Sequence, residues 1–373
     1  MKKISLNDFL IILSNDVEDR KQLSSYPLKK VESDNVKSFN IKGKQIFSSN
    51  NSELKRSDYL TRLNTFFLNK IPLNSSAVAY RKEKSYLNFF EPHTSSYNFL
   101  RLDIKSFFHN ISTDLVRDVF SSYFNDEYFF NDDEEKQTLI EAFVNLIFID
   151  VSNKFSKSSL RGKEILPIGF ETSPSVSNII FRRFDILIQE FCSRNNILYT
   201  RYADDMLFSS SKEFKLIHSD RFLNEISYII SKGGFKLNLK KTISAINTIS
   251  INGYVLENNN DGVCNFRISN KKTKIIEKIL YSLDSGKDYS YVLKKYRGTF
   301  LNDNKILYRS KVLEFKRTYY KSQIINVLCG YRSYLISILL FNEKSDVLER
   351  KYIEKYSKLI TKLEERIDKT NKH

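Results

Sequence analysis

The stretch that decides the fold reads YTRYADDMLFS and spans residues 199–209. Aromatic and apolar residues stand on both sides of the adjacent carboxylates Asp204 and Asp205, and few residues here favour a helix. The pattern predicts a short β-hairpin with arms at residues 197–202 and 206–209. Neighbouring residues of a straight strand point to opposite faces, whereas a tight turn lets both carboxylates reach one site.

Two adjacent carboxylates in a turn have two physical explanations. Asp is common in turns because it tolerates left-handed backbone geometry and hydrogen-bonds its own backbone. The alternative is a divalent-metal site, since Mg²⁺ prefers one or two carboxylates together with waters and substrate phosphates. For an isolated Asp-Asp turn the structural explanation is the commoner one, so the functional explanation needs a partner elsewhere in the chain.

That partner is Asp103, a carboxylate at the end of a predicted strand over residues 98–102. Ser112 or Thr113 can cap the helix that follows it. With Asp204, Asp103 completes the smallest set for a two-metal site, in which two ions clamp the attacking and leaving oxygens of a phosphoryl transfer. Because 101 residues separate the two carboxylates, different strands must bring them together, as in an antiparallel sheet with helices on one face.

Three motifs in this order resemble those of reverse transcriptases. YADD at 202–205 resembles their catalytic motif, and Asp103 with Phe107 and Phe108 resembles the first catalytic motif. Between them, LPIGFETSPSVSN at 166–178 resembles the intervening motif in the form found in retron and other bacterial reverse transcriptases. By this resemblance the chain is identified as a member of the bacterial retron-like and defence-associated (antiviral) reverse transcriptases.

The resemblance implies an α+β fold of the right-hand polymerase type, with fingers, an antiparallel-sheet palm that carries the YADD hairpin, and a helical, basic thumb. The expected parts are an N-terminal extension with fingers at 1–96, a palm at 97–266 with a fingers insertion at about 114–165, a thumb at 267–342 and a C-terminal amphipathic helix at 343–373. The last helix either packs on the thumb or forms an interface with a partner, and the sequence leaves both open.

The implied activity is that of an RNA-directed DNA polymerase, which adds dNTPs by phosphoryl transfer with two Mg²⁺ ions, or with Mn²⁺ as a substitute. Asp103 and Asp204, together with the carbonyl of Ile104, are expected to hold the ions about 3.5–4 Å apart. Asp205 completes the catalytic set as a secondary ligand or a support. The implied partners are dNTPs, a non-coding RNA as template and the DNA product, with a second protein or a homo-oligomer as further candidates.

The resemblance also assigns residues to the incoming nucleotide and to the template and primer. A planar guanidinium fork suits phosphate oxygens, a phosphate-paired lysine can protonate the leaving pyrophosphate, and a bulky ring excludes a ribose 2′-hydroxyl. The nucleotide residues are Arg81, the backbone of Ser106 and Phe107, the ring of Phe108, Gly169, Phe170 and Lys241, with Lys240 as an alternative to Lys241. The template and primer residues are Thr172, Ser173, Asn178, Gly253 and Arg267.

Two departures from the family pattern stand out. Ile168 occupies a position where most relatives have Gln, so a side-chain hydrogen bond to the incoming nucleotide is lost and fidelity or substrate preference is expected to differ. Retron enzymes carry an Asn-Ala-x-x-His element before the first motif and a Val-Thr-Gly element after the palm. Here only His93 of the first element is kept, and the second reads Ile-Asn-Gly at 251–253. These differences favour the broader defence-associated group over a true retron enzyme.

The chain is basic, and its positive charge is concentrated in the last third. It has 373 residues, of which 41% are hydrophobic, and a formal net charge of +16. Residues 267–373 hold 25 lysines and arginines against 12 acidic residues, whereas residues 1–266 are close to neutral. General solubility does not need such asymmetry, and a lobe that binds a phosphate backbone explains it better.

The cysteines and the apolar segments bear on the cellular compartment. The three cysteines are far apart and odd in number, which favours a reduced cytosolic protein over a disulfide framework or a zinc site. The N-terminus lacks the apolar core of a signal peptide. We found no apolar run of about 18 residues, so we expect no membrane span and a cytoplasmic location.

Hydrophobic periodicity and capping residues predict the remaining elements. We expect the acidic cluster at 131–135 to begin a helix that continues to residue 148, because carboxylates stabilise a helix N-terminus. The other predictions are helices at 58–68, 113–124, from 172–178 onward, 214–231, 271–283, 289–300, 311–334 and 343–368, and an alternating strand at 249–256.

Three alternative functions remain open at the level of sequence. One is a template-independent or protein-primed DNA polymerase on the same palm, with a tyrosine hydroxyl as primer, although none of the 22 tyrosines stands out. Another is a non-catalytic RNA-binding scaffold, which the three intact carboxylates disfavour. The third is an RNA-dependent RNA polymerase, which Phe108 and the YADD form disfavour.

Overall fold

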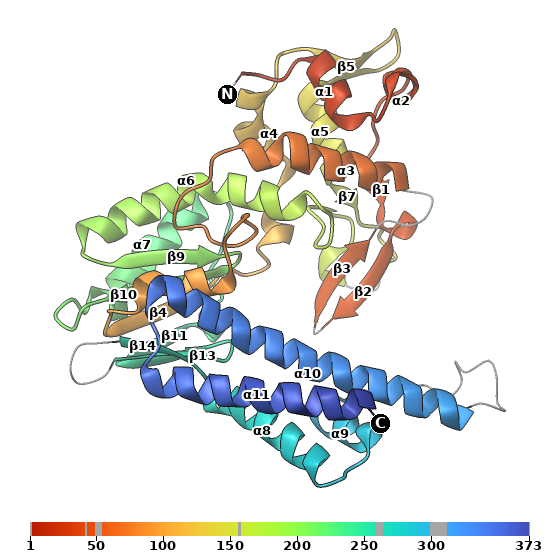
Figure 1. The fold of residues 1–373 in the computed structure, drawn as a ribbon. Coiled ribbons are helices and arrows are strands. Elements are labelled where there is room, and N and C mark those ends of the chain that lie inside the picture. The colour runs from red at the N-terminus through yellow and green to blue at the C-terminus, as the bar shows by residue number, and fades with distance from the viewer. Residues whose placement is uncertain are drawn as a thin grey trace. The chain divides into compact units, whose positions relative to one another are not determined.

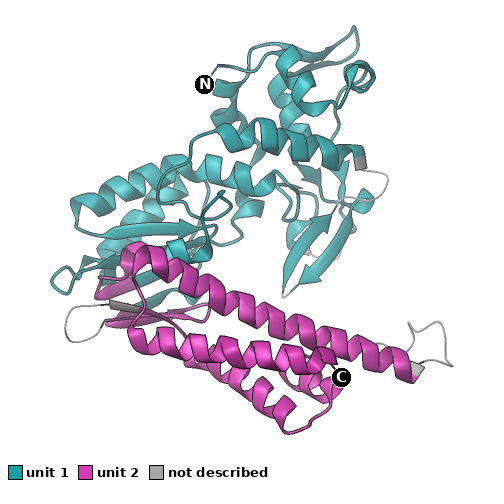
Figure 2. Cartoon of the chain, in the orientation of Figure 1, with its two compact units in different colours: residues 1–89, 100–244 teal, residues 90–99, 245–373 magenta. Residues whose placement is uncertain are grey.

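The computed structural model describes residues 2–41, 43–48, 54–155, 158–258, 264–298 and 312–372. The chain divides into two compact units, shown in different colours in Figure 2. Unit 1 consists of residues 1–89 and 100–244, and unit 2 of residues 90–99 and 245–373. Both units mix helices with β-sheets, in line with the predicted α+β class. The boundaries of fingers, palm and thumb stay predictions.

Unit 1 surrounds several small sheets with helices (Figure 1). Its helices are α1 (Leu6–Leu13), α2 (Val17–Leu23), α3 (Leu54–Phe66), α4 (Thr113–Phe120), α5 (Leu139–Ile147), α6 (Ser173–Arg194) and α7 (Asp220–Ser231). Three of its sheets are small: β1 (Val31–Glu32), β7 (Ile149–Asp150) and β8 (Glu164–Ile165); the hairpin β2 (Lys37–Ile41) and β3 (Lys44–Ser48); and the hairpin β5 (Tyr128–Asn131) and β6 (Lys136–Thr138).

Helix starts in unit 1 follow local side-chain caps. Ser112 caps α4, because its side chain accepts a hydrogen bond from the backbone N–H of Leu115, as the sequence predicts. Ser219 caps α7 in the same way, so this helix starts at Asp220, six residues later than expected. Short polar side chains at these positions offer partners to the first, otherwise unpaired, N–H groups of each helix.

The acidic cluster at 131–135 does not begin a helix, which corrects the sequence prediction. Strands β5 and β6 form an antiparallel hairpin here, and the Asp132 carboxylate accepts hydrogen bonds from the backbone N–H groups of Glu134 and Glu135 at 2.9 and 2.6 Å. Such local bonds stabilise a turn. Helix α5 starts only at Leu139, where Thr138 and Glu141 form a capping box.

A four-stranded sheet carries the segments that contain the predicted carboxylates. Its strand order is β11-β4-β10-β9, with β4 at Asn98–Asp103, β9 at Leu198–Tyr202, β10 at Asp205–Ser210 and β11 at Ile243–Ile246. Strands β9 and β10 form an antiparallel hairpin in which Asp205 lies opposite Tyr202. Helix α6 runs along β9 in Figure 1. The predicted hairpin arms and the strand before Asp103 therefore belong to one sheet.

Aromatic side chains form the core next to this sheet in unit 1. The rings of Phe107, Phe181 and Phe235 contact one another, with centroids 5.3 to 5.7 Å apart. All three belong to the buried hydrophobic cluster. Because Phe107 follows Asp103 by four residues, this packing anchors the segment that leaves the carboxylate.

Unit 2 combines a three-stranded antiparallel sheet with four long helices in its described residues. The elements are β12 (Thr248–Ile251), β13 (Tyr254–Asn258), β14 (Cys264–Ile268), α8 (Asn270–Asp284), α9 (Tyr289–Arg297), α10 (Val312–Ser345) and α11 (Arg350–Lys372). The predicted single strand at 249–256 is in fact a hairpin that turns at Asn252 and Gly253, both at positive φ. Phe300 and Lys311, at the ends of two predicted helices, lie outside the described residues.

The C-terminal helix packs within unit 2. Figure 1 shows α11 alongside α10 and close to α8, and its buried side chains recur at helical spacing. Tyr356 of α11 is fully buried, and its hydroxyl accepts a hydrogen bond from the backbone N–H of Ile268 at 2.8 Å. Of the two arrangements that the sequence leaves open, the structure therefore shows packing on the neighbouring helices.

Helix α10 is longer than the predicted helix at 311–334, and it includes a long apolar segment. It continues without a break to Ser345, and over Leu313–Ser345 it is long and apolar enough to cross a membrane by length and composition. This corrects the expectation that no segment qualifies. About 22% of its most apolar window is buried. A single helix of this kind is weak evidence for a membrane span, because the core helix of a soluble protein passes the same test.

Candidate catalytic site

The structure brings the first carboxylate segment against the YADD turn. The backbone N–H of Ile104 donates a hydrogen bond of 2.9 Å to the carbonyl of Asp204. On the other side, the carbonyl of Asp103 accepts one of 2.8 Å from the N–H of Asn238, and the N–H of Lys105 donates one of 2.9 Å to the carbonyl of Lys236. The end of β4 is therefore fixed between two segments that follow it by more than a hundred residues.

The YADD turn has a strained backbone. Ala203 adopts φ of 55°, a left-handed conformation that is unfavourable for residues other than glycine. The turn places Asp204 at its tip and Asp205 at the start of β10. Asp103 and Asp205 are buried, whereas the Asp204 side chain keeps 25% of its surface exposed. Of the two turn carboxylates, Asp204 is thus the more accessible to a ligand.

Each of the three carboxylates lies beside a cationic side chain. The ammonium of Lys241 is 3.1 Å from Oδ2 of Asp103, and that of Lys44 is 3.7 Å from Oδ2 of Asp204. Of these two lysines, the family resemblance points to Lys241 but not to Lys44. Lys44 is the first residue of β3 in the β2–β3 hairpin. Its place as a basic residue near a hairpin turn is the one sequence feature that could have indicated a role at this site. These pairs offset the negative charge gathered here.

Asp205 has a different environment from the other two carboxylates. The guanidinium of Arg101 binds Oδ1 of Asp205 through two nitrogens, with Nε at 3.1 Å. Burial nevertheless raises the pKa of Asp205, because it outweighs the effect of Arg101, and the charges of Asp204 and Asp103 add to the rise. A carboxylate engaged in this way suits the predicted supporting role better than direct metal binding.

The donor set fits the predicted magnesium site. Hard oxygen donors come from Asp103, Asp204 and the carbonyl of Ile104, and Mg²⁺ typically needs only one or two carboxylates when substrate phosphates complete its coordination. No group of three or more His, Cys, Asp or Glu side chains positioned to hold a metal occurs among the residues that the structure describes. Any Mg²⁺ held here would therefore take further ligands, such as substrate phosphates, besides these protein oxygens.

Phe108 lies at the edge of the site rather than in the core. Its side chain is half-buried, and its ring packs edge-on against Phe107 at 5.4 Å and Tyr80 at 6.4 Å between centroids. Tyr80 is 47% exposed and has a positive φ of 60°. Burial, followed by the negative charge of Asp204, raises the pKa of Tyr80 to about 12. Tyr80 therefore lies near the YADD turn, a position that the sequence did not indicate.

The intervening motif is tied to the β2–β3 hairpin through its backbone. The N–H of Phe47 donates a hydrogen bond of 2.7 Å to the carbonyl of Ile168, the residue that replaces the usual Gln. Gly169 has φ of 112°, and a Cβ there would lie 2.2 Å from the carbonyl oxygen of Phe47. Glycine is therefore required by close backbone approach. The side chain of Phe170 is packed in the core, so only its backbone is left for a nucleotide.

The residues assigned to the template at the start of α6 are buried. Thr172 and Ser173 have no exposed surface, and Asn178 has 1%. The Ser173 hydroxyl donates to the carbonyl of Pro167, and the Asn178 amide donates to the carbonyl of Ala79. The side chains of Ser173 and Asn178 thus bind other parts of the protein, and the assignment of these three residues to the template stays a prediction.

The start of α6 lacks the usual side-chain cap. Thr172 occupies the N-cap position, but its side chain makes no capping hydrogen bond. Its buried hydroxyl finds no hydrogen-bond partner among the described residues. Pro174 in the first turn fits the predicted helix start, because its missing N–H would be unpaired there in any case.

Arg81 lies beside a cationic cavity. Its guanidinium donates hydrogen bonds of 2.9 and 3.0 Å to the carbonyls of Asn74 and Ala77. The cavity has a volume of about 410 Å³, and its lining includes Lys70, Arg81 and Lys82 but no carboxylate. Tyr80 also lines it. A cavity with this charge suits an anionic ligand such as a phosphate.

The other two residues assigned to the template and primer belong to unit 2. Gly253 has φ of 86° in the turn between β12 and β13. Arg267 in β14 donates to the Glu257 carboxylate at 2.7 Å. Both belong to the three-stranded sheet of unit 2 or to its turn, and their assignment to the template and primer stays a prediction.

Comparison with known proteins agrees with this arrangement of motifs. The profile of the family described as "Reverse transcriptase (RNA-dependent DNA polymerase)" matches residues 50–256, more than half of the chain. The chain is 27% identical over 175 residues to the Retron Ec86 reverse transcriptase of Escherichia coli, covering 47% of each protein. It is 25% identical over 228 residues to the Retron Ec83 reverse transcriptase of Escherichia coli, covering 61% of this chain and 68% of that protein.

The similar regions cover only part of the relatives' lengths. The chain spans about half of the length of the Ec86 protein and about two thirds of that of the Ec83 protein. Among solved structures, telomerase from Candida albicans aligns with a TM-score of 0.40 and 13% identity, covering 94% of this chain and 62% of that chain.

Proposed function

This chain belongs to the reverse transcriptase (RNA-dependent DNA polymerase) family, and we propose on that premise that it is an RNA-directed DNA polymerase that extends a primer with dNTPs. The observation that carries the proposal is the hydrogen bond between Ile104 and Asp204. It joins two carboxylate-bearing segments that are distant in sequence, which supports a shared site for a pair of divalent ions.

Residues of unit 1 would have different roles in this reaction. Asp103, Asp204 and the carbonyl of Ile104 would hold Mg²⁺, which when bound makes a primer hydroxyl more acidic and neutralises charge on the transferred phosphate. Lys241 and Lys44 would exchange their carboxylate partners for phosphate oxygens when a nucleotide enters. Arg101 keeps Asp205 in place, and Phe108 occupies the position that would meet the sugar.

Primer extension by the purified chain tests the proposed activity. We expect a labelled primer annealed to an RNA template to be lengthened when dNTPs and Mg²⁺ are present, and not when a chelator removes the metal. Absence of extension on RNA, with extension on DNA or without any template, would replace this proposal with another polymerase. Nucleotide found by mass spectrometry on a tyrosine would point to protein priming.

We propose further that the template is an associated non-coding RNA and that the protein acts in the cytoplasm in defence against phage. The similarity to retron reverse transcriptases and the basic last third of the chain support this proposal. Sequencing of the RNA and DNA that co-purify with the chain from its native host tests the template. A phage challenge of that host, with and without the gene, tests the role.

Removal of charge from the cationic cavity is expected to weaken RNA binding in a salt-dependent way. Lys70 and Lys82 line the cavity and are exposed, and neither pairs with a carboxylate among the described residues. If each contacts one phosphate, the double Lys70→Ala, Lys82→Ala variant should lower the slope of log affinity against log salt by about 1.4 for single-stranded RNA. Fluorescence anisotropy with a labelled RNA measures that slope.

A matched variant controls for the general loss of positive charge. Lys21 and Lys29 are exposed lysines of the same unit that do not line the cavity. The Lys21→Ala, Lys29→Ala protein should keep the wild-type slope. If both double variants shift the slope equally, the cavity has no special part in binding the strand.

A further inference from the structure

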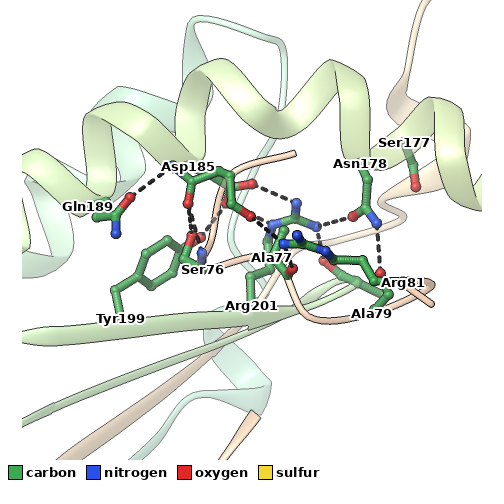
Figure 3. Close-up of polar contacts among 12 residues, drawn as sticks. Ser76, Ala77, Ala79, Arg81, Ser177, Asn178, Asp185, Gln189, Tyr199 and Arg201 are labelled. Carbon is green, nitrogen blue, oxygen red and sulfur yellow. Dashed lines mark hydrogen bonds and ion pairs between the residues drawn. The ribbon is translucent and has the colours of Figure 1, made fainter. Parts of the chain in front are cut away.

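Arg201 is a fully buried cation three residues before Asp204, and the nucleotide and template assignments do not include it. It lies in β9 and forms a bidentate ion pair with Asp185 of α6, with Nε at 2.8 Å from Oδ1 and Nη2 at 2.7 Å from Oδ2 (Figure 3). Neither side chain has any exposed surface. Burial lowers the pKa of Arg201, but the charge and hydrogen bonds of Asp185 together with the effect of Tyr199 outweigh burial, so the pKa is raised and Arg201 stays charged.

The ion pair uses two of the three guanidinium nitrogens of Arg201. The third, Nη1, binds Asn178 and the backbone of the YADD turn. Nη1 of Arg201 donates hydrogen bonds of 3.1 Å to the side-chain oxygen of Asn178 and of 3.0 Å to the carbonyl of Ala203. The ring of Phe181 packs against the guanidinium at 4.6 Å. The fork is therefore fixed in direction by Asp185, Asn178 and Phe181, and the Ala203 carbonyl receives a donor with little freedom to move.

Ala203 is the residue whose backbone needs such support. Its left-handed conformation is costly for alanine and persists only where its surroundings hold it. Its carbonyl belongs to the peptide plane that enters Asp204. The carbonyl of Asp204 itself is held by Ile104. Arg201 and Ile104 thus hold the peptide planes on both sides of Asp204, so only side-chain torsions remain to place its carboxylate.

The same residues connect the turn to the loop that carries Tyr80. The backbone N–H of Arg201 donates to the carbonyl of Ser76 at 2.7 Å, and its carbonyl accepts from the N–H of Val78 at 2.8 Å. The amide of Asn178 donates to the carbonyl of Ala79, also at 2.8 Å. Figure 3 shows these groups around the guanidinium between α6 and β9. A shift of Arg201 would therefore disturb both the YADD turn and the segment before Tyr80.

We propose that Arg201, oriented by Asp185 and Asn178, is a positioning residue that sets the Ala203 carbonyl and through it the metal-binding carboxylate of Asp204. Stability alone does not account for the pair, because a buried ion pair can often be replaced by well-packed apolar side chains without loss of stability. The inference rests on the proposed polymerase function, since it assigns a role within that site.

A triple variant separates positioning from stability. Arg201→Met with Asp185→Leu removes the ion pair as a unit, and Tyr199→Phe removes the hydroxyl that donates to Asp185 at 2.8 Å. We expect the thermal unfolding midpoint to stay near that of the wild type. The kcat for primer extension and the affinity for Mn²⁺, measured by electron paramagnetic resonance without substrates, should each fall by about 10–100-fold.

Two further variants complete the experiment. Tyr199→Phe alone should keep wild-type kcat and Mn²⁺ affinity, because it leaves the bonds of Arg201 to Asp185, Asn178 and the Ala203 carbonyl intact. Arg201→Lys keeps a charge for Asp185 and so protects the fold, but one ammonium lacks the rigid fork that serves Asp185, Asn178 and Ala203 together. The Arg201→Lys protein should therefore show the same fall in kcat and Mn²⁺ affinity that is expected of the triple variant. It provides this test even if the triple variant fails to fold.

The outcomes distinguish this inference from the proposed function. If the wild type extends primers, and the folded triple variant and Arg201→Lys match it in kcat and Mn²⁺ affinity, the positioning role is wrong and the polymerase proposal stands. If the wild type extends no primer, the polymerase proposal fails, and the Mn²⁺ measurement alone decides whether Arg201 positions Asp204. Loss of kcat with unchanged Mn²⁺ affinity would also contradict the inference, because Asp204 would then be in place.

Discussion

Asp204→Asn is expected to abolish primer extension while the protein stays folded. Asparagine keeps the shape of the side chain but removes the charge, and Asp204 is the partly exposed carboxylate at the tip of the turn. A metal ion contributes several kcal/mol of transition-state stabilisation, so its loss should lower the rate by about 10³-fold or more. Single-turnover extension of an annealed primer measures the rate.

Asp133→Asn serves as the matched control, because it removes an exposed carboxylate from the β5–β6 turn. It should extend primers like the wild type. Extension by the Asp204→Asn protein at more than a tenth of the wild-type rate would exclude Asp204 as a metal ligand. Full protection against phage by an inactive Asp204→Asn protein would instead favour the RNA-binding scaffold.

Phe108→Ala is expected to let the protein incorporate ribonucleotides. The ring is half-buried at the edge of the site and packs on Phe107 and Tyr80. A single steric contact in a binding pocket typically discriminates by about 10–200-fold. The preference for dNTPs over NTPs should therefore decrease by a factor in that range. The ratio of kcat/KM for dATP and ATP on one template measures the preference.

Tyr80→Phe is the matched control for this experiment. It keeps the ring against Phe108 and removes only the hydroxyl, so the preference for dNTPs should not change. Unchanged discrimination in the Phe108→Ala protein would assign the exclusion of ribose to another group. A loss of dATP incorporation without any gain of ATP incorporation would show that Phe108 supports the fold of the site instead.

Patterns that are local in sequence predicted much of the fold. The hairpin around the YADD turn follows from aromatic and apolar residues on both sides of two turn-forming carboxylates. The Ser112 cap and the Pro174 helix start follow from short-range chemistry. These signals work because the groups that interact are within four residues of each other. The order of the three motifs also led to the family and to the carboxylates Asp103 and Asp204.

Local patterns failed where two local structures compete. The acidic residues at 131–135 favour a helix start as much as a turn, and pairing of β5 with β6 decided for the turn. Helix α10 was predicted with wrong limits because few glycines and prolines mark the boundaries, and the predicted strand at 249–256 is interrupted by the turn at Asn252 and Gly253. The sequence also did not predict which side chains of a motif are buried. Thr172, Ser173 and Asn178 belong to the intervening motif and yet face the interior.

By itself the sequence determined the family, the hairpin at the YADD turn and the carboxylates that are predicted to form the site. Only the tertiary structure decided their partners: Lys241 for Asp103, Lys44 for Asp204, Arg101 for Asp205, and Arg201 for the turn itself. The reason is physical. A turn or a cap is set by residues a few positions apart, whereas a buried charge takes its partner from whichever distant segment packs against it, and no short-range pattern records that choice.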